Sequence, residues 1–287
     1  MAQITYYANF GEIPFGDITK KETRRWIPDA FDVLCGGFPC QPFSIAGVTK
    51  KNSMGRMHGF EDEKQGNLFF YIAEIIERHR PKAIFLENVK NLLSHNRGNT
   101  FKIIKEILTN LGYSFHYRIL DGKYFVPQHR ERVFMVGFDS EVFHYGEEFS
   151  FPDMPVKDLK VKDILMEDVD TKYTLSDQLW RYLQEYANKH KANGNGFGFG
   201  IADLEGITRT MSARYYKDGS EILIAQKYRN PRRLTPRECA LLQGYPDEFI
   251  IPVSDTQAYR QFGNSVVVPL IEAIGKCIVN AIKRNFE

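Results

Sequence analysis

A cysteine closely follows the first buried strand that the sequence predicts. The apolar run 31–35 is typical of such a strand, and a glycine pair comes next. The segment 37–44, GFPCQPFS, then places Cys40 just past the carboxyl end of the strand, where open α/β sheets bind ligands. A thiolate at this position could act as a nucleophile. A buried structural cysteine is the alternative, and Cys40 by itself does not decide between the two.

A carboxylate and two arginines accompany later strands. Glu87 directly follows the predicted strand 82–86, where half-burial would let its carboxyl donate a proton near neutral pH. Arg130 and Arg132 would share one face of a strand and clamp an anion or a carbonyl group. The alternatives are a helix cap or a solvated charge for Glu87, and a solvated strand end for the two arginines.

A polar turn precedes the last predicted helix. The turn is the segment QFGNSV over 261–266, and the helix over 267–284 carries one apolar face. Exposed amides at the start of a helix bind carboxylates and other polar ligands. A plain helix cap is the alternative for this turn.

In the first half of the chain, the predicted elements that must hold these residues alternate between strands and helices. Short apolar runs near 31–35, 82–86, 113–120 and 132–138 alternate with amphipathic stretches at 67–80 and 101–111. This alternation predicts a parallel or mixed sheet with helices on both faces, so the fold class is α/β.

The alternation of strands and helices stops between about 150 and 235, which predicts a second, smaller and irregular domain. Its signals are a helix capped by Ser176, a glycine-rich run over 194–200, and a capping box at Thr235–Glu238. We therefore expect a catalytic domain over 1–155 with 262–287 packing back onto it. We expect the smaller domain over 156–235 and a hinge over 236–261.

Composition narrows the class of protein. The 287 residues include 38 Lys and Arg against 36 Asp and Glu, a net charge of +2, with 43% hydrophobic residues. These values exclude wholesale disorder. No apolar run approaches the ~20 residues of a membrane span, and the first residues lack a secretory signal. The four cysteines show no metal-binding or disulfide spacing. We expect a reduced cytoplasmic protein with no metal site and no membrane partner.

Five ordered blocks together are far more specific than any one residue. GFPCQPFS, ENVKN, PQHRERV, RRLTPRECALLQGYPD and QFGNSVVVPL closely resemble the signature blocks of the DNA cytosine-5 methyltransferases, from about Asn9 to the C-terminus. The resemblance implies a Rossmann-like sheet dependent on S-adenosylmethionine and a smaller target-recognition domain. It implies methyl transfer to C5 of a flipped cytosine in a specific duplex DNA site, as part of restriction-modification.

The resemblance also assigns catalytic roles. Cys40 resembles the nucleophile that adds to C6 of cytosine, which turns C5 into a carbon able to accept a methyl group. Glu87 resembles the acid that meets N3 and the exocyclic amine. Arg132 resembles the contact to O2, with Arg130 supporting it. Asn88 resembles a residue that holds the loop at Pro39–Cys40.

Further positions match binding residues of the family. The expected cofactor neighbours are Asp17, Ile18, Pro39, Leu68, Asn264, Ser265 and Val266. The expected substrate and DNA contacts are Gln41, Ser44, Asn88, Gln128, Arg209 and Thr210. Eight Lys or Arg against two Asp or Glu over 209–237 suit a phosphate-facing surface.

The chain departs from the family pattern at its start. The family opens with a strand, an FxGxGG turn and an acidic residue, whereas Met1 here falls just before the segment that follows them. We expect either a truncated chain, a separate N-terminal fragment, or self-association that covers an exposed sheet edge. The alternative function is a truncated or split form that binds DNA but is inactive without that cofactor segment. A cysteine hydrolase that pairs Cys40 with one of the seven histidines is a third reading, although no spacing fixes such a pair.

Overall fold

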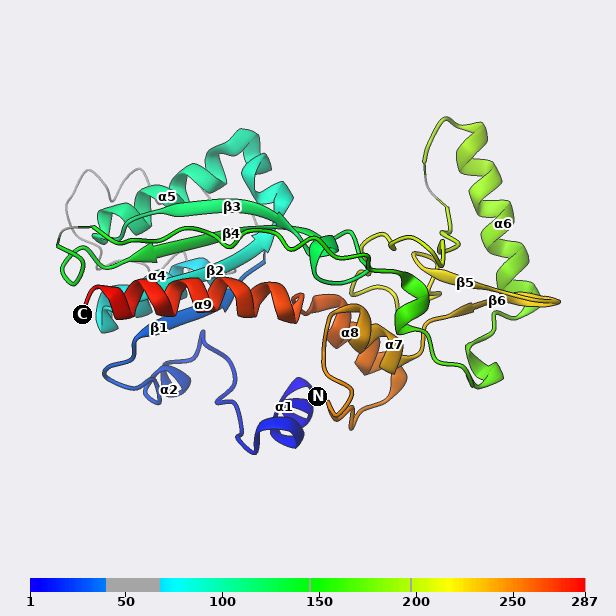
Figure 1. Ribbon diagram of the computed structural model, residues 1–287, viewed down its shortest axis with the longest axis horizontal. Helices are drawn as coiled ribbons and strands as arrows, with labels where there is room; N and C mark the ends of the chain where they lie inside the picture. Colours follow the sequence, from blue (N-terminus) through cyan, green and yellow to red (C-terminus); the bar gives the residue numbers. More distant parts are fainter. Residues whose placement is uncertain (40–67, 145, 197, 287) are drawn as a thin grey trace. The chain divides into compact units, whose positions relative to one another are not determined.

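The computed structural model describes residues 1–39, 68–144, 146–196 and 198–286 (Figure 1). The chain divides into two compact units, which are described one at a time. The sheet unit comprises Phe15–Leu120, Glu131–Phe151 and Lys276–Glu287. The hairpin unit comprises Met1–Pro14, Asp121–Arg130 and Pro152–Gly275.

A four-stranded mixed sheet forms the centre of the sheet unit. Its order is β1-β2-β4-β3, and the strands are β1 Val33–Gly37, β2 Ala83–Val89, β3 His116–Asp121 and β4 Glu131–Phe138. β1 pairs with β2 in parallel, whereas β2 pairs with β4 antiparallel. The first four residues of β2, AIFL, are all buried, as expected for a strand covered on both faces. The predicted mixed α/β sheet is confirmed, with β1 two residues later than expected and β3 three residues later.

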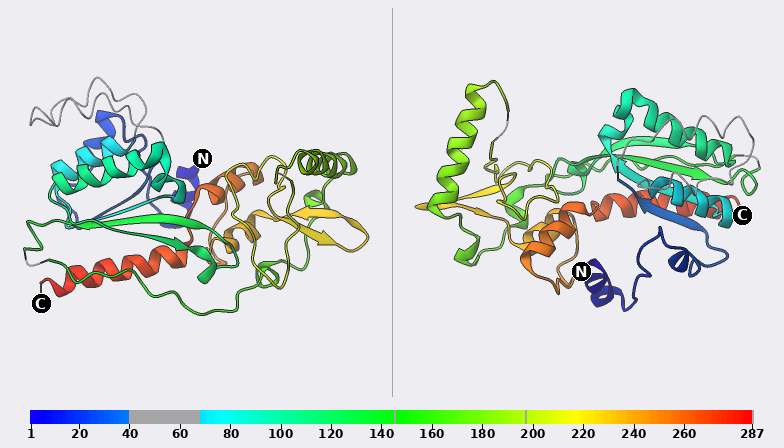
Figure 2. Two further views of the ribbon diagram at one scale, coloured as in Figure 1. Left: turned by 90° about the horizontal axis from the view of Figure 1, so that it is seen from above. Right: turned by 180° about the vertical axis from the view of Figure 1, so that it is seen from behind.

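Helices cover both faces of this sheet, as predicted (Figure 2). α4 Leu68–His79 and α5 Asn99–Asn110 lie on one face, and the part of α9 from Lys276 onward lies on the other. α4 buries Phe69, Ile72, Ala73 and Ile76 at helical spacing, and these side chains share a core cluster with β2 and β4. The shorter elements are α2 Lys21–Arg24, η1 Lys90–Leu93 and η2 His95–Gly98.

The hairpin unit is built from helices, short 3-10 turns and one two-stranded sheet. Its elements are α1 Ala2–Phe10, η3 Gly122–Tyr124, η4 Val161–Ile164, η5 Thr171–Tyr173, α6 Asp177–Ala192, β5 Leu223–Gln226, β6 Arg229–Arg233, α7 Pro236–Leu242, α8 Asp255–Asn264 and the start of α9 Val268–Arg284. The predicted caps are present. The Ser176 hydroxyl accepts from the Leu179 amide at 3.3 Å, and Thr235 and Glu238 form the capping box.

Two expectations need correction or restatement. The segment 261–266 is not a turn, because α8 continues to Asn264 and only 265–267 connect it to α9. The hairpin unit extends over 152–275 and takes in Met1–Pro14 and Asp121–Arg130. The functional boundaries at 155, 235 and 261 stay predictions.

One stretch, Asp255–Arg284, has the length and apolar composition of a membrane span, whereas the sequence predicted no run of that length. The same test is passed by core helices of soluble proteins, so it is weak evidence for a span. Residues 265–267 interrupt the stretch between α8 and α9.

Gly137 in β4 provides a test of how tightly this sheet is packed. A Cβ atom there would lie 2.5 Å from the Ser114 carbonyl oxygen and 3.1 Å from the Ile84 side chain. We expect Gly137→Ala to lower the free energy of unfolding by about 1–3 kcal/mol, measured by urea denaturation. Gly275→Ala is the control, because the described residues place no heavy atom within 4 Å of its Cβ position in α9, apart from its chain neighbours and the backbone of its own helix. It should stabilise by roughly 0.5–1 kcal/mol, and equal effects of both changes would contradict the packing described.

Candidate active site

A carboxylate and a guanidinium meet on one face of the sheet. Glu87 lies on β2 opposite Phe134, and Arg132 lies on β4 opposite Val89. The two are therefore diagonal neighbours on the same face. Arg132 Nε lies 3.0 Å from Glu87 Oε1, and the two side chains are 17% and 22% exposed. The pair is thus mostly shielded from water, and both side chains stay partly exposed.

The end of β1 passes directly beside this carboxylate. Gly37, the last residue of β1, pairs with Glu87 in the parallel ladder. A Cβ atom on Gly37 would lie 3.4 Å from Glu87 Oε2, so a longer side chain would crowd the carboxylate. The glycine keeps the approach to Glu87 open at the carboxyl end of the strand.

Burial and pairing act on Arg132 in opposite directions. Burial lowers the pKa of the guanidinium, while the Glu87 carboxylate and its hydrogen bond raise it, and the net direction is downward. An arginine stays protonated in a protein even so. Arg132 Nη1 also donates to the Glu131 carbonyl at 2.8 Å, which fixes the plane of the group. Together the two side chains present an acceptor and rigid donors, a combination that suits the edge of a polar ring.

Asn88 joins the ends of β1 and β2. Its side chain is 2% exposed, and its Nδ2 donates to the Phe38 carbonyl at 2.7 Å. Its Oδ1 accepts from the Val89 amide at 2.8 Å. The expected loop-holding function needs a contact of this kind, because Phe38 precedes Pro39. The predicted residues Cys40, Gln41 and Ser44 lie outside the described residues.

Arg130 is not part of an arginine clamp, contrary to expectation. β4 begins at Glu131, so the alternation that would place Arg130 and Arg132 on one face does not extend to Arg130. Its side chain is 4% exposed and belongs to the hairpin unit. The guanidinium donates to the carbonyls of Met211, Gly263 and Ser265 at 2.9, 3.1 and 2.7 Å. Arg130 therefore positions backbone, and its work is structural within this unit.

Residues 127–129 and 208–210 run side by side. Thr208 N donates to the Pro127 carbonyl at 2.8 Å, and His129 N donates to the Thr208 carbonyl at 2.8 Å. The Thr210 hydroxyl donates to the His129 carbonyl at 2.6 Å. Arg209 lies exposed between the two threonines. The ladder thus fixes the backbone around Arg209 and Thr210, whose DNA contacts stay predictions.

Gln128 differs from its expected role as a DNA contact. The residue is 0% exposed, its Nε2 donates to the Leu242 carbonyl at 3.1 Å, and its Oε1 accepts from the Met211 amide at 3.0 Å. Both polar ends of the Gln128 amide are therefore bonded to backbone and shielded from solvent. The side chain holds this segment in place and has no free polar group for a direct DNA contact.

The expected cofactor neighbours fall in both units. Asp17, Ile18, Pro39 and Leu68 belong to the sheet unit, and Asn264, Ser265 and Val266 belong to the hairpin unit. Asp17 is exposed and accepts from the amide and the hydroxyl of Thr19 at 2.9 and 2.8 Å. The Thr19 amide and hydroxyl hydrogen bonds lower the pKa of Asp17, so an ionised acceptor faces solvent. Such an acceptor fits the amino group of a purine.

The RRLTPREC block holds a buried ion pair that no sequence pattern predicted. Arg232 and Glu238 are 8% and 0% exposed and join through two bonds of 2.8 Å. Glu238 also accepts from the Met166 amide at 2.9 Å. The capping box was the available signal, but it did not show that its glutamate also binds an arginine.

The hydrogen bonds of Asp121 predict that the stability of the fold depends on pH. It accepts from the amides of Lys123 and Arg130 and from the His129 ring. Burial would raise the pKa of Asp121, but these bonds outweigh it and bring the pKa below 3.8. Because the native pKa is lowered, the stabilisation is complete above pH 3.8 and is lost as pH falls through the native value.

We expect Asp121→Asn to be less stable than wild type by about 1–2 kcal/mol at pH 7, because a donor replaces one carboxylate acceptor. Urea unfolding at pH 2–7 should show this difference shrinking as pH falls below 3.8, where unfolding takes up a proton on Asp121. Asp153→Asn is an exposed control expected within about 0.5 kcal/mol of wild type. A difference that persists unchanged at pH 2 would refute the assignment.

A substitution of Arg130 tests whether its three hydrogen bonds to carbonyls stabilise the hairpin unit. A lysine has one ammonium group and cannot reach three carbonyls with the planar fork of arginine. We expect Arg130→Lys to lower the free energy of unfolding by about 2–3 kcal/mol and to speed hydrogen exchange over 209–213. Arg209→Lys is the matched control, since Arg209 is exposed and a change there should stay within about 0.5 kcal/mol. Unchanged exchange in Arg130→Lys would show that the three bonds are dispensable.

Comparisons with known proteins agree with the ordered blocks. The family model of C-5 cytosine-specific DNA methylases matches residues 1–280. The chain is 52% identical to the type II methyltransferase M.SsoII of Shigella sonnei over 283 residues, which covers 98% of this chain and 72% of that protein. It is 44% identical to the type II methyltransferase M.HpaII of Haemophilus parainfluenzae over 305 residues, covering 100% and 82%.

A solved structure shows the same fold at low identity. The Dnmt2 methyltransferase of S. pombe matches with a TM-score of 0.68 and 17% identity, covering 98% of this chain and 88% of that one. At this identity the likeness supports the fold and carries no statement about substrate.

Proposed function

We propose, from the premise that this chain belongs to the C-5 cytosine-specific DNA methylase family, that it methylates C5 of cytosine in duplex DNA within a restriction-modification system. The methyl donor proposed is S-adenosylmethionine. The observation that carries the chemistry is the Glu87–Arg132 pair at the carboxyl end of β2, beside the glycine that ends β1.

Cytosine needs covalent activation for this reaction. Its C5 is too electron-poor to attack a methyl donor directly, and addition of a thiolate to C6 makes C5 nucleophilic. After methylation, C5 loses its proton and the thiolate leaves, which restores the ring. A base inside a duplex is out of reach, so the cytosine must be flipped from the stack.

Glu87 and Arg132 suit the far edge of such a ring. We assign Glu87 to N3 and the exocyclic amine: its carboxyl takes up a proton from solvent and donates it to N3 as negative charge builds there during thiolate addition. We assign Arg132 to O2, because its guanidinium is charged and held rigidly by the Glu87 carboxylate and the Glu131 carbonyl. Their ion pair preorganises both groups before the base arrives.

The nucleophile proposed is Cys40, which directly follows Pro39 in the chain. Asn88 supports this assignment because it fixes the carbonyl of Phe38, the residue before Pro39. Arg130 and Gln128 are reassigned from direct contacts to positioning residues, since their polar groups bind backbone carbonyls and amides.

S-adenosylmethionine would supply an electrophilic methyl group when bound. Within the sheet unit, the ionised Asp17 fits an adenine amino group, and Gly36 and Gly37 keep the end of β1 free of side chains. We propose that Ile18, Pro39 and Leu68 supply apolar contacts to the same molecule. The assignment of Asn264, Ser265 and Val266 to the cofactor stays a prediction for the hairpin unit.

The partner proposed is double-stranded DNA, and the place of action proposed is the cytoplasm. A separate N-terminal fragment or self-association stays a prediction from the sequence. The identity of the target site depends on side chains that meet base edges in the grooves.

A mechanism-based trap tests the proposed function. Fluorine at C5 cannot leave as a proton does, so the adduct with the nucleophile persists after methyl transfer. We expect wild-type protein, incubated with S-adenosylmethionine and a mixed-sequence duplex containing 5-fluorocytosine, to form a covalent complex whose peptide mass maps to Cys40. Cys40→Ser should form none, and Glu87→Gln should form it roughly 10²–10⁴-fold more slowly.

The other readings give different results in the same experiment. A protein that only binds DNA would shift the duplex without covalent capture, and a cysteine hydrolase would ignore DNA and cleave an activated ester. Tyr182→Ala, a change on an exposed face of α6, is the control expected to trap at the wild-type rate. Capture through a residue other than Cys40 would contradict the assigned nucleophile.

A further inference from the structure

The tip of the β5–β6 hairpin breaks a local rule of backbone structure. Gln226 pairs with Arg229, so Lys227 and Tyr228 form a two-residue turn. Tyr228 has φ +61°, a left-handed conformation that favours glycine or asparagine over an aromatic residue. Its side chain is 92% exposed and so gains almost no packing in return. A strained residue with no structural compensation is a candidate for function.

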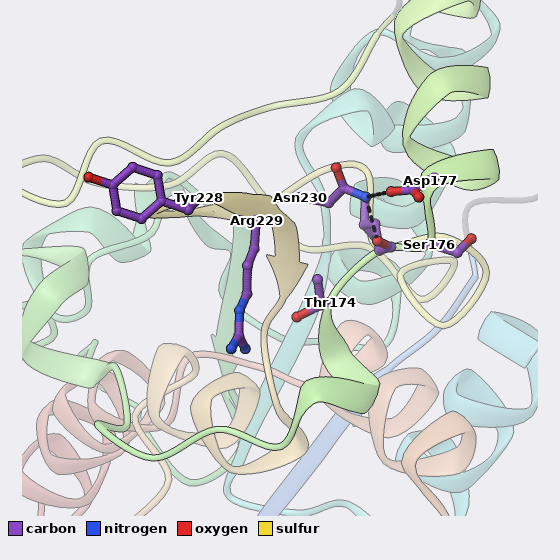
Figure 3. Close-up of a pocket in the computed structure, with 7 residues that line it drawn as sticks. Thr174, Ser176, Asp177, Tyr228, Arg229 and Asn230 are labelled. Atoms are coloured by element: carbon purple, nitrogen blue, oxygen red, sulfur yellow. Dashed lines mark hydrogen bonds between the residues drawn. The ribbon is translucent and has the colours of Figure 1, made fainter.

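The base of the same hairpin is firmly held. Leu223 and Ile224 are 0% and 4% exposed. Gln226 Nε2 donates to the Thr174 hydroxyl at 2.9 Å and to the Asn230 carbonyl at 2.7 Å. Asn230 Nδ2 in turn donates to the Leu175 carbonyl at 3.0 Å and to Asp177 Oδ1 at 2.7 Å (Figure 3). These bonds fix the hairpin against the start of α6.

The strained tip therefore stands on a rigid base beside an open hollow. The hollow measures about 800 Å³ and is lined by Thr174, Leu175, Ser176, Asp177, Tyr228, Arg229 and Asn230. Tyr228 and Arg229 extend from the tip in different directions (Figure 3). A tip of this kind reaches outward without bending.

The tip also carries positive charge. Lys227, Tyr228 and Arg229 are all exposed, and Lys227 Nζ lies 5.1 Å from the centroid of the Tyr228 ring. In the described part of the chain, no ion pair involves Lys227 or Arg229. The Asp177 carboxylate, the acidic group lining the hollow, already accepts from Asn230. A tyrosine that is exposed between two cations in the chain, one of which lies beside its ring, suits a polyanion that also offers flat sugar or base surfaces.

We propose that residues 227–229 form a contact to the backbone of duplex DNA, with Lys227 and Arg229 on phosphates and Tyr228 against the sugar between them. The proposal rests on the proposed function and names the part of the hairpin unit that grips the substrate. Phosphate contacts carry no sequence information, so the tip holds DNA in register while other residues read the bases.

A salt titration with a mixed-sequence duplex tests the two cations. Because backbone contacts are independent of sequence, a 40-base-pair duplex of random sequence is a sufficient probe. We expect Lys227→Ala/Arg229→Ala to bind it about 10-fold or more weakly. The slope of log affinity against log salt should become shallower by about 2, since each lost phosphate contact removes ~0.9. An unchanged slope and affinity would overturn the proposal.

Tyr228→Gly separates a functional tyrosine from a structural one. Glycine adopts φ +61° without a Cβ penalty, so the variant should melt at or above the wild-type temperature. We expect it nevertheless to bind the duplex several-fold more weakly. Binding equal to wild type, or a fall in melting temperature together with binding, would show that Tyr228 does not act on DNA.

Matched changes elsewhere on the unit complete the test. Tyr182→Ala and Lys157→Ala replace an exposed tyrosine and an exposed lysine that do not line the hollow, and both should bind as wild type does. The covalent trap at Cys40 distinguishes failure of this inference from failure of the proposed function. If wild type traps 5-fluorocytosine DNA while the tip variants bind normally, only this inference fails. If wild type neither binds nor traps DNA, the proposed function fails and takes the inference with it.

Discussion

The pairing register between β2 and β4 is the constraint on which the candidate active site depends. It sets Glu87 opposite Phe134 and Arg132 opposite Val89, so carboxylate and guanidinium meet at 3.0 Å on one face. A slip of one residue would send one of them to the opposite face and leave a half-buried charge unpaired. The buried run AIFL in β2 prevents that slip, because its side chains fit only between the layers of helices. Apolar burial thus holds the polar pair in place.

Arg130 and Arg132, two residues apart in the chain, make different kinds of contact. Arg132 is part of β4 and pairs with Glu87 while partly exposed, whereas Arg130 precedes the strand and donates to three backbone carbonyls. Residues 198–222 have little regular structure, so their backbone groups need partners from side chains. Arg130 and Gln128 are two of the side chains that supply them, through the carbonyl and the amide of Met211. The PQHR segment therefore organises an irregular region through Gln128 and Arg130.

Local signals were sufficient to predict most elements. The apolar periodicity of α4 and α5, the Ser176 cap and the Thr235–Glu238 capping box all correspond to the observed helices, because each depends on residues within a few positions of one another. The turn expected at 261–266 failed for the opposite reason. Its polar residues suggested a turn, but burial of Tyr259, Phe262 and Gly263 in the hairpin unit carries α8 on to Asn264.

The sequence by itself determined the family, the mixed α/β class and the residue types at the candidate site, since ordered motifs and hydrophobic periods are properties of the chain alone. Only the tertiary structure decided which of those residues come together and which bond to the backbone. Glu87 and Arg132 are 45 positions apart and meet through strand pairing, while Gln128 and Arg130 turn inward to backbone groups contributed by residues at 211, 242, 263 and 265. Such long-range contacts arise from packing, and no local pattern encodes them.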